Sequence, residues 1–387
     1  MASQDSDTTV TSRPVVALTL DSQLFQAVPE NYAWNHTFIS KITQPDTIFS
    51  LAYTGQSMVD GFINHNVAGR IGNTALHLLT ALAGSYPTHE SGHWYRLLNG
   101  LWGSPPTEVE DLLRSIGGLN TTQDFAQRYV LAPYLGLASD WAYLVNKADT
   151  SFYSIQEALA KATWNPKGTD LSRYLEFRYK KDGTSDTGLE RSYLAALQVW
   201  NLLDLYKPTA RILRDMVNGV RPTNPYAPGE WTLKTEGYLS SGGPLFGAKA
   251  LYFVEGHSSR PSALTLEGWV APLKSPEMND YPFGFGVELT RIPLPVKFGN
   301  VRPSVSATFG ASFQAPNPWQ IVDEATAKTA TPQASTILLE GGGGVHFETD
   351  RVEMALKFHC RQDRILWREN FDSQCSVSVG MEILLGR

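Results

Sequence analysis

The chain has 387 residues, of which 42% are hydrophobic and 18% are charged, and its formal net charge is −6. This length allows two domains, and the acidic balance gives no reason to expect a nucleic-acid partner. No apolar run reaches the roughly 18 residues of a transmembrane helix, so none is expected.

Residues 1–13 are polar and are expected to form a flexible arm. Residues 14–228 are expected to be mainly helical, because apolar residues recur there at spacings of three and four. One short helix is predicted from Asn73 to Gly84. A second is predicted to begin near Pro87, since proline is tolerated in a first turn, and to run to about Asn99.

Further along this region, Asn120-Thr121-Thr122-Gln123 is typical of a capping box, with Asn120 as the N-cap of the next helix. The segment 222–229 contains three prolines and a glycine, which is typical of a boundary between domains. We therefore predict a helical domain over 14–228 and a different structure over 229–387.

The stretch Thr88-His89-Glu90-Ser91-Gly92-His93 has the pattern H-E-x-x-H. On a helix, residues four apart share one face, so both imidazoles can reach a single metal ion. The glutamate beside the first histidine is then placed to take a proton from a water molecule at that ion. The spacing therefore predicts a metal-dependent hydrolytic site.

These residues resemble the motif of the zincin metallopeptidases, and the resemblance is confined to the motif and its helix. It implies one zinc ion held by His89 and His93, with Glu90 as the general base. It also implies that the helical domain is zincin-like, and that the chain is an enzyme that cleaves peptide bonds.

A catalytic zinc needs a third protein ligand. The position six residues after His93 is Asn99, so a third histidine of the metzincin type is not expected, and a carboxylate from a following helix is the alternative. Asp124 is favoured, because it lies in the first turn of the capped helix. The other candidates are Glu108, Glu110, Asp111 and Asp140. His77 is a further candidate, expected to hydrogen-bond a metal ligand and not to bind the ion itself.

Residues 229–387 change to a period of two, which indicates β-strands. In the clearest case, 301–314, apolar residues occupy the odd positions and polar or small residues the even ones. About eight such segments of roughly ten residues occur, joined by turns rich in Pro, Asn and Asp. The predicted fold class is therefore α+β, with a helical domain followed by an antiparallel β-barrel.

Alternation does not show which face of the strands is buried. The strand lengths and the small or charged residues on one face resemble an outer-membrane β-barrel surrounded by lipid. The alternative is a soluble β-domain with the apolar face inside. Cys360 and Cys375 flank a polar stretch, and a hairpin there would allow a disulfide.

The predicted function is that of a zinc-dependent metallopeptidase anchored in the bacterial outer membrane. Its helical domain would face the periplasm and cleave periplasmic or membrane-associated polypeptides. Two alternatives remain open. One is a non-enzymatic outer-membrane protein with a metal-stabilised domain, and the other is a zinc hydrolase of amide or ester bonds in lipid or cell-wall material.

Overall fold

The computed structural model describes residues 22–23, 52, 56, 66–101, 118–120, 122–123, 126, 139–149, 170–171, 174, 187–218, 229–240, 243–254, 262–272, 283–314, 336–349, 352–361, 364–365, 370–371 and 374–383. The longest helices in these ranges are α3 (Val67–Leu101), α7 (Thr187–Leu202) and α8 (Tyr206–Asn218), and residues 139–149 are also helical. Within the same ranges, no helix is long and apolar enough to cross a membrane.

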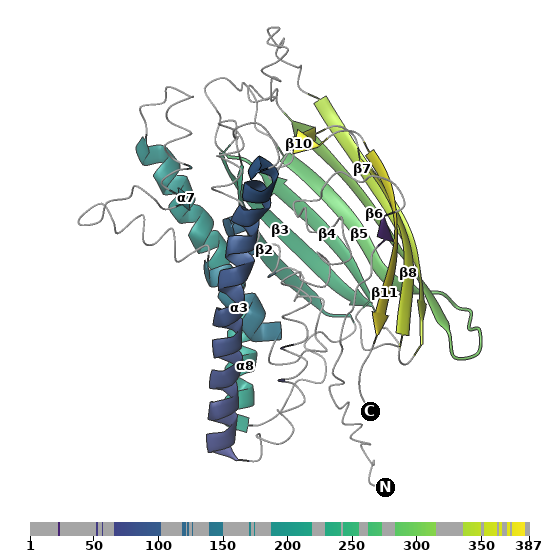
Figure 1. Ribbon diagram of the computed structural model, residues 1–387, viewed down its shortest axis with the longest axis horizontal. Coiled ribbons are helices and arrows are strands. Elements are labelled where there is room, and N and C mark those ends of the chain that lie inside the picture. The colour runs from purple at the N-terminus through teal and green to yellow at the C-terminus, as the bar shows by residue number, and fades with distance from the viewer. Residues whose placement is uncertain are drawn as a thin grey trace.

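The strands form one large antiparallel sheet, with a separate short pair beside it (Figure 1). Its members are β1 (Ser22–Gln23), β2 (Trp231–Ser240), β3 (Gly243–Val254), β4 (Ser262–Val270), β5 (Phe283–Pro293), β6 (Arg302–Gln314), β7 (Thr336–Glu348), β8 (Val352–Arg361) and β11 (Gln374–Ile383). Their spatial order is β1-β11-β8-β7-β6-β5-β4-β3-β2. The separate pair is β9 (Arg364–Ile365) with β10 (Asn370–Phe371).

The predicted closed barrel is wrong, because the sheet is open between β2 and β11. The strands from β2 to β8 pair in chain order, as hairpins that follow one another do, and β11 adds to β8. In a closed barrel β2 would then pair with β11. Instead β11 pairs with the two residues of β1, and helical residues lie along the free edge of β2.

Side chains from helical residues and from the turn after α7 satisfy backbone groups of two residues at the free edge of β2. The Asn120 amide accepts from the N–H of Leu239 at 2.9 Å and donates to its carbonyl at 2.9 Å. Asp204 accepts from the N–H of Thr235 at 3.1 Å, and Lys147 donates to the Thr235 carbonyl. Asn120 is itself helical and makes these long-range bonds, so its predicted role as an N-cap is wrong.

The helices also do not form a separate zincin-like domain. Helix α7 packs on β2 and β3, and the Trp200 indole donates to the Gly247 carbonyl at 2.7 Å. Helix α3 packs on α8, where Arg70 donates to the carbonyls of Met216 and Val217 at 3.2 and 2.9 Å. The described helices therefore pack on one another and, through α7, on the first strands of the sheet.

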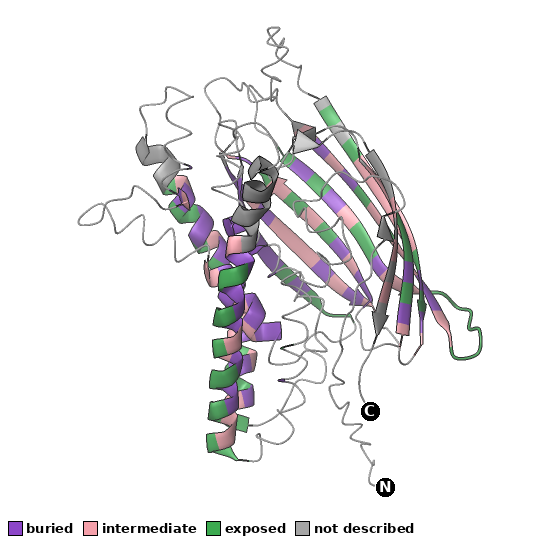
Figure 2. Cartoon of the chain, viewed as in Figure 1, coloured by how far each residue is buried: buried purple, intermediate pink, exposed green. Residues whose placement is uncertain are grey.

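Buried and exposed residues alternate along the strands (Figure 2), and the polar face of the sheet is the more buried one. His346 and Glu353 are 2% and 3% exposed, whereas Phe309 and Leu356 on the opposite face are 47% and 50% exposed. Buried charges on the polar face pair with one another, as Arg291 does with Glu353 at 3.1 Å. The usual arrangement of an apolar inside and a polar outside is thus reversed across these strands.

The two cysteines lie opposite one another in the register of β8 and β11. Cys360 is disulfide-bonded, and Cys375 is the only other cysteine of the chain. The disulfide therefore links two neighbouring strands close to the open end of the sheet.

Reducing this disulfide is expected to lower the free energy of unfolding by about 3 kcal/mol, the loop-closure entropy for a connection of this length. The measurement is denaturant unfolding with and without dithiothreitol. The double variant Cys360→Ser/Cys375→Ser should match the reduced protein and should not respond to the reductant. An unchanged midpoint on reduction would contradict the prediction.

Candidate functional site

The motif lies on α3, which runs without interruption through Pro87. The predicted helix start near Pro87 is therefore wrong. Proline removes one backbone N–H from the helix interior. Nearby hydroxyls supply hydrogen bonds in this turn: Thr88 Oγ1 donates to the Gly84 carbonyl at 2.8 Å, and Ser85 Oγ donates to the Leu82 carbonyl at 3.2 Å. These bonds go to the carbonyls on either side of Ala83, whose own N–H partner proline removes, and α3 continues past Pro87.

Because the helix is continuous, His89 and His93 lie one turn apart on the same face. His89 is buried, and Glu90 beside it is half-buried. The backbone of His93 is helical, and its side chain lies outside the described residues. The backbone thus has the geometry that the motif requires.

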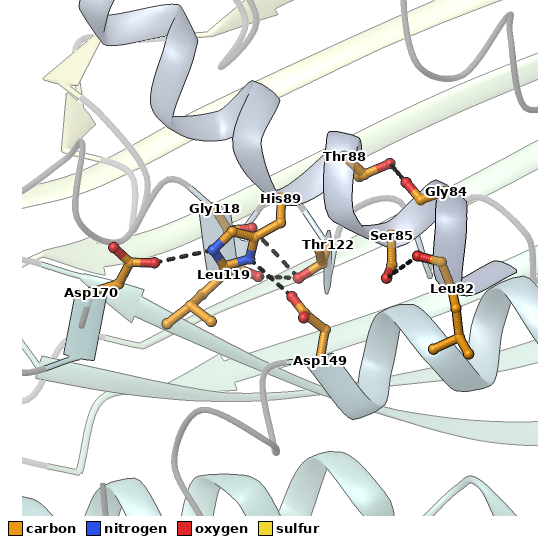
Figure 3. A network of polar contacts seen from close by, with 10 residues as sticks. All are labelled: Leu82, Gly84, Ser85, Thr88, His89, Gly118, Leu119, Thr122, Asp149 and Asp170. Atoms are coloured by element: carbon orange, nitrogen blue, oxygen red, sulfur yellow. Dashed lines mark hydrogen bonds and ion pairs between the residues drawn. The ribbon is translucent and has the colours of Figure 1, made fainter. Parts of the chain in front are cut away.

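His89 lies between two carboxylates, which the sequence analysis did not single out (Figure 3). Its Nδ1 is 2.9 Å from Asp149 Oδ2, and its Nε2 is 3.0 Å from Asp170 Oδ2. Asp149 lies in the helical segment 139–149, and Asp170 comes from a later segment of the chain. Three separate segments therefore converge on one buried imidazole.

The two carboxylates control the charge of His89. Burial by itself lowers the pKa of the imidazole, but the hydrogen bonds to Asp149 and Asp170, together with their negative charges, raise it to about 9. Without a metal ion, both ring nitrogens carry protons at neutral pH and donate to the two carboxylates. The cluster is then one cation held between two anions.

The other predicted site residues are distributed as follows. Asp124, Glu108, Glu110 and Asp111 lie outside the described residues. His77 is buried on α3, twelve residues before His89, which corresponds to about 18 Å along the helix axis. Asp140 is held by Arg211, whose Nε lies 3.0 Å from its Oδ2. Neither His77 nor Asp140 is therefore placed to contact His89.

Neither of the two carboxylates at His89 left a signal in the local sequence. Asp149 lies in the helical segment 139–149, 60 positions from His89. Nothing in the local sequence distinguishes Asp170, whose partner lies 81 positions away.

The donor types around His89 suit zinc, which binds imidazole nitrogen and carboxylate oxygen. In the described part of the chain, no three His, Cys, Asp or Glu side chains are grouped so that they could hold a metal ion. The reason is geometric: Asp149 and Asp170 lie on opposite nitrogens of His89, so only one of them can share an ion with it. Among the described residues, His89 and one aspartate could therefore share a zinc ion. A further ligand must come from outside the described residues.

The helical segment that carries Asp149 is fixed to the sheet by a second buried cluster. Lys147 Nζ lies 2.6 Å from Asp204 Oδ1 and 3.1 Å from Thr235 Oγ1. The Tyr143 hydroxyl donates to Asp204 Oδ2 at 2.5 Å. Because Lys147 and Asp149 are two residues apart, the attachment to β2 also positions the carboxylate that contacts His89.

Comparison with known proteins finds no match for the chain among family models, curated proteins or solved structures. Any function proposed for this chain therefore depends on the geometry around His89.

Proposed function

We propose that the chain is a zinc-dependent peptidase. The observation that carries this proposal is the position of His89, buried in an H-E-x-x-H helix with a carboxylate on each ring nitrogen. Residues of one motif and two distant aspartates would then serve a single site.

In this site, His89 and His93 would bind the ion, and Asp170 would be the third protein ligand. Asp170 lies at Nε2, the nitrogen farther from the backbone, which two histidines on one helix face can direct to a common point. Asp149 lies at Nδ1 and would hold the imidazole in the required tautomer, as carboxylates behind metal-bound histidines commonly do. Asp149 is thus a positioning residue.

A zinc ion in this site would act as a Lewis acid on a substrate carbonyl and would make water nucleophilic near neutral pH. Glu90 follows His89 directly on the helix and is half-buried, which supports a role at the rim of this site. It would accept the proton of the attacking water and deliver it to the leaving amine. The ester or amide bonds of lipid and cell-wall material could be cleaved by the same residues.

A non-enzymatic role has its own supporting observation. Both nitrogens of His89 are already hydrogen-bonded, so Asp149–His89–Asp170 could stabilise the helices as an ion cluster without any metal. The two roles predict different effects of Asp170→Asn on zinc binding, because asparagine keeps the shape of the side chain and loses its charge.

Metal content of the purified full-length chain is the test. The wild-type chain is expected to bind one zinc after chelation and dialysis against zinc chloride, and Asp170→Asn is expected to bind it at least about 100-fold more weakly. Asp149→Asn should weaken zinc binding by about 10-fold to 100-fold. Glu230→Gln, at an exposed ion pair far along the chain, is the control and should bind like the wild type. A wild-type chain without zinc would overturn the proposal and favour the ion cluster.

A further inference from the structure

One face of the large sheet is apolar and uncharged across its whole width. The register aligns Leu266, Phe285, Phe309, Leu339, Leu356 and Phe358 on this face, and all six side chains are more than a third exposed. We call this surface the apolar face. At the described positions of β3 to β8 and of β11, no Asp, Glu, Lys, Arg or His lies on it.

The charged residues of the same strands lie on the opposite face, and several of them are paired there. Lys249 contacts Glu236 at 2.9 Å and Glu267 at 3.4 Å, and His346 contacts Glu353 at 2.8 Å. This segregation is complete along the strands, although charges normally cover the exposed side of a sheet. The exposed face is thus suited to an environment that cannot solvate charge.

We propose that the apolar face contacts the hydrocarbon chains of a lipid bilayer. A protein partner would be expected to meet a polar rim, since protein interfaces are about as polar as other surfaces apart from their centres. Where the structure describes β3 to β8 and β11, the apolar face has no charged position. A bilayer interior matches both its extent and its lack of charge.

The dimensions of the strands agree with this partner. The eight long strands contain 9 to 13 residues each, and a tilted strand needs about 9–11 to cross the hydrocarbon layer. Trp231 and Tyr252 lie beside one another at one end of the face, with ring centroids 4.9 Å apart. Such rings favour the boundary between hydrocarbon and headgroups.

A sheet edge in lipid must have its backbone groups satisfied by protein. At β2 this is achieved by Asn120 on Leu239 and by Lys147 and Asp204 on Thr235. Helical residues and the turn after α7 thus satisfy the backbone groups of Thr235 and Leu239 at the edge that faces the opening of the sheet. This inference does not depend on zinc, and it would bring the site around His89 close to the membrane.

Photolabelling tests the contact in the wild-type chain. The full-length protein is reconstituted into phosphatidylethanolamine and phosphatidylglycerol vesicles in which one acyl chain bears a diazirine, and adducts are mapped by mass spectrometry. Adducts are expected on Phe285, Phe309 and Leu356 and not on Glu353 or His346. Equal labelling of both faces, or none on the apolar face, would overturn the proposal.

A matched pair of variants tests the same contact by vesicle flotation. Phe309→Lys places a charge on the apolar face and should reduce the vesicle-bound fraction about tenfold or more. Thr308→Lys, its neighbour on the polar face, lies opposite Glu288 in the register and should bind within twofold of the wild type. Equal flotation of the two variants would count against lipid contact. So would a detergent-free dimer that protects the apolar face.

Discussion

Replacing Glu90 with glutamine is expected to lower hydrolysis of fluorescein-labelled casein by about 10²-fold to 10⁴-fold while leaving one zinc bound per chain. Glutamine has nearly the same shape as glutamate and cannot accept the proton of the attacking water. The ligands at His89 are not altered by the change, because Glu90 is not among the carboxylates that contact the imidazole.

Three measurements separate this effect from damage to the fold. Zinc content should equal that of the wild type, the far-ultraviolet circular dichroism should be unchanged, and Glu90→Asp should recover part of the activity. Glu230→Gln serves as the control at an exposed position. Full activity in Glu90→Gln would show that another group takes the proton, and Glu90 would lose its assigned role.

Replacing Lys147 with methionine is expected to lower the free energy of unfolding by about 3–5 kcal/mol, because it leaves Asp204 as a buried anion without its cation. Burial lowers the pKa of Lys147, whereas the negative charge of Asp204 raises it from 2.6 Å away. The ammonium group therefore depends on Asp204 to stay charged inside the protein. The variant also removes the donor to the Thr235 carbonyl at the edge of β2.

The matched control is Lys207→Met, which breaks an ion pair of 3.6 Å whose partners are partly exposed. Exposed pairs contribute about 0–1 kcal/mol, so this variant should remain close to the wild type. The double variant Lys147→Met/Asp204→Asn should regain part of the loss, since the buried anion is removed as well. Denaturant unfolding in detergent measures all three. Equal losses for Lys147→Met and Lys207→Met would contradict the prediction.

The candidate site could be predicted only in its local part. His89 and Glu90 are recognisable because one helical turn determines their relation to His93. The sequence does not predict Asp149 and Asp170, because they lie 60 and 81 positions from His89 and no local pattern indicates the contact. The favoured ligand, Asp124, was chosen from its place at a predicted capping box, and Asp124 lies outside the described residues. Local signals of this kind describe helix ends, whereas a ligand is selected by the approach of distant segments.

The fold divides in the same way. The alternation over 301–314 identifies a strand that the structure has at Arg302–Gln314, because a period of two follows directly from backbone geometry. Alternation is identical for a sheet with its apolar face inside or outside, so only the tertiary structure decided that the polar face is the buried one. Whether the sheet closes into a barrel was also decided by the tertiary structure alone. Asn120 bonds to Leu239 across 119 positions, and this contact, not pairing with β11, determines where the sheet ends.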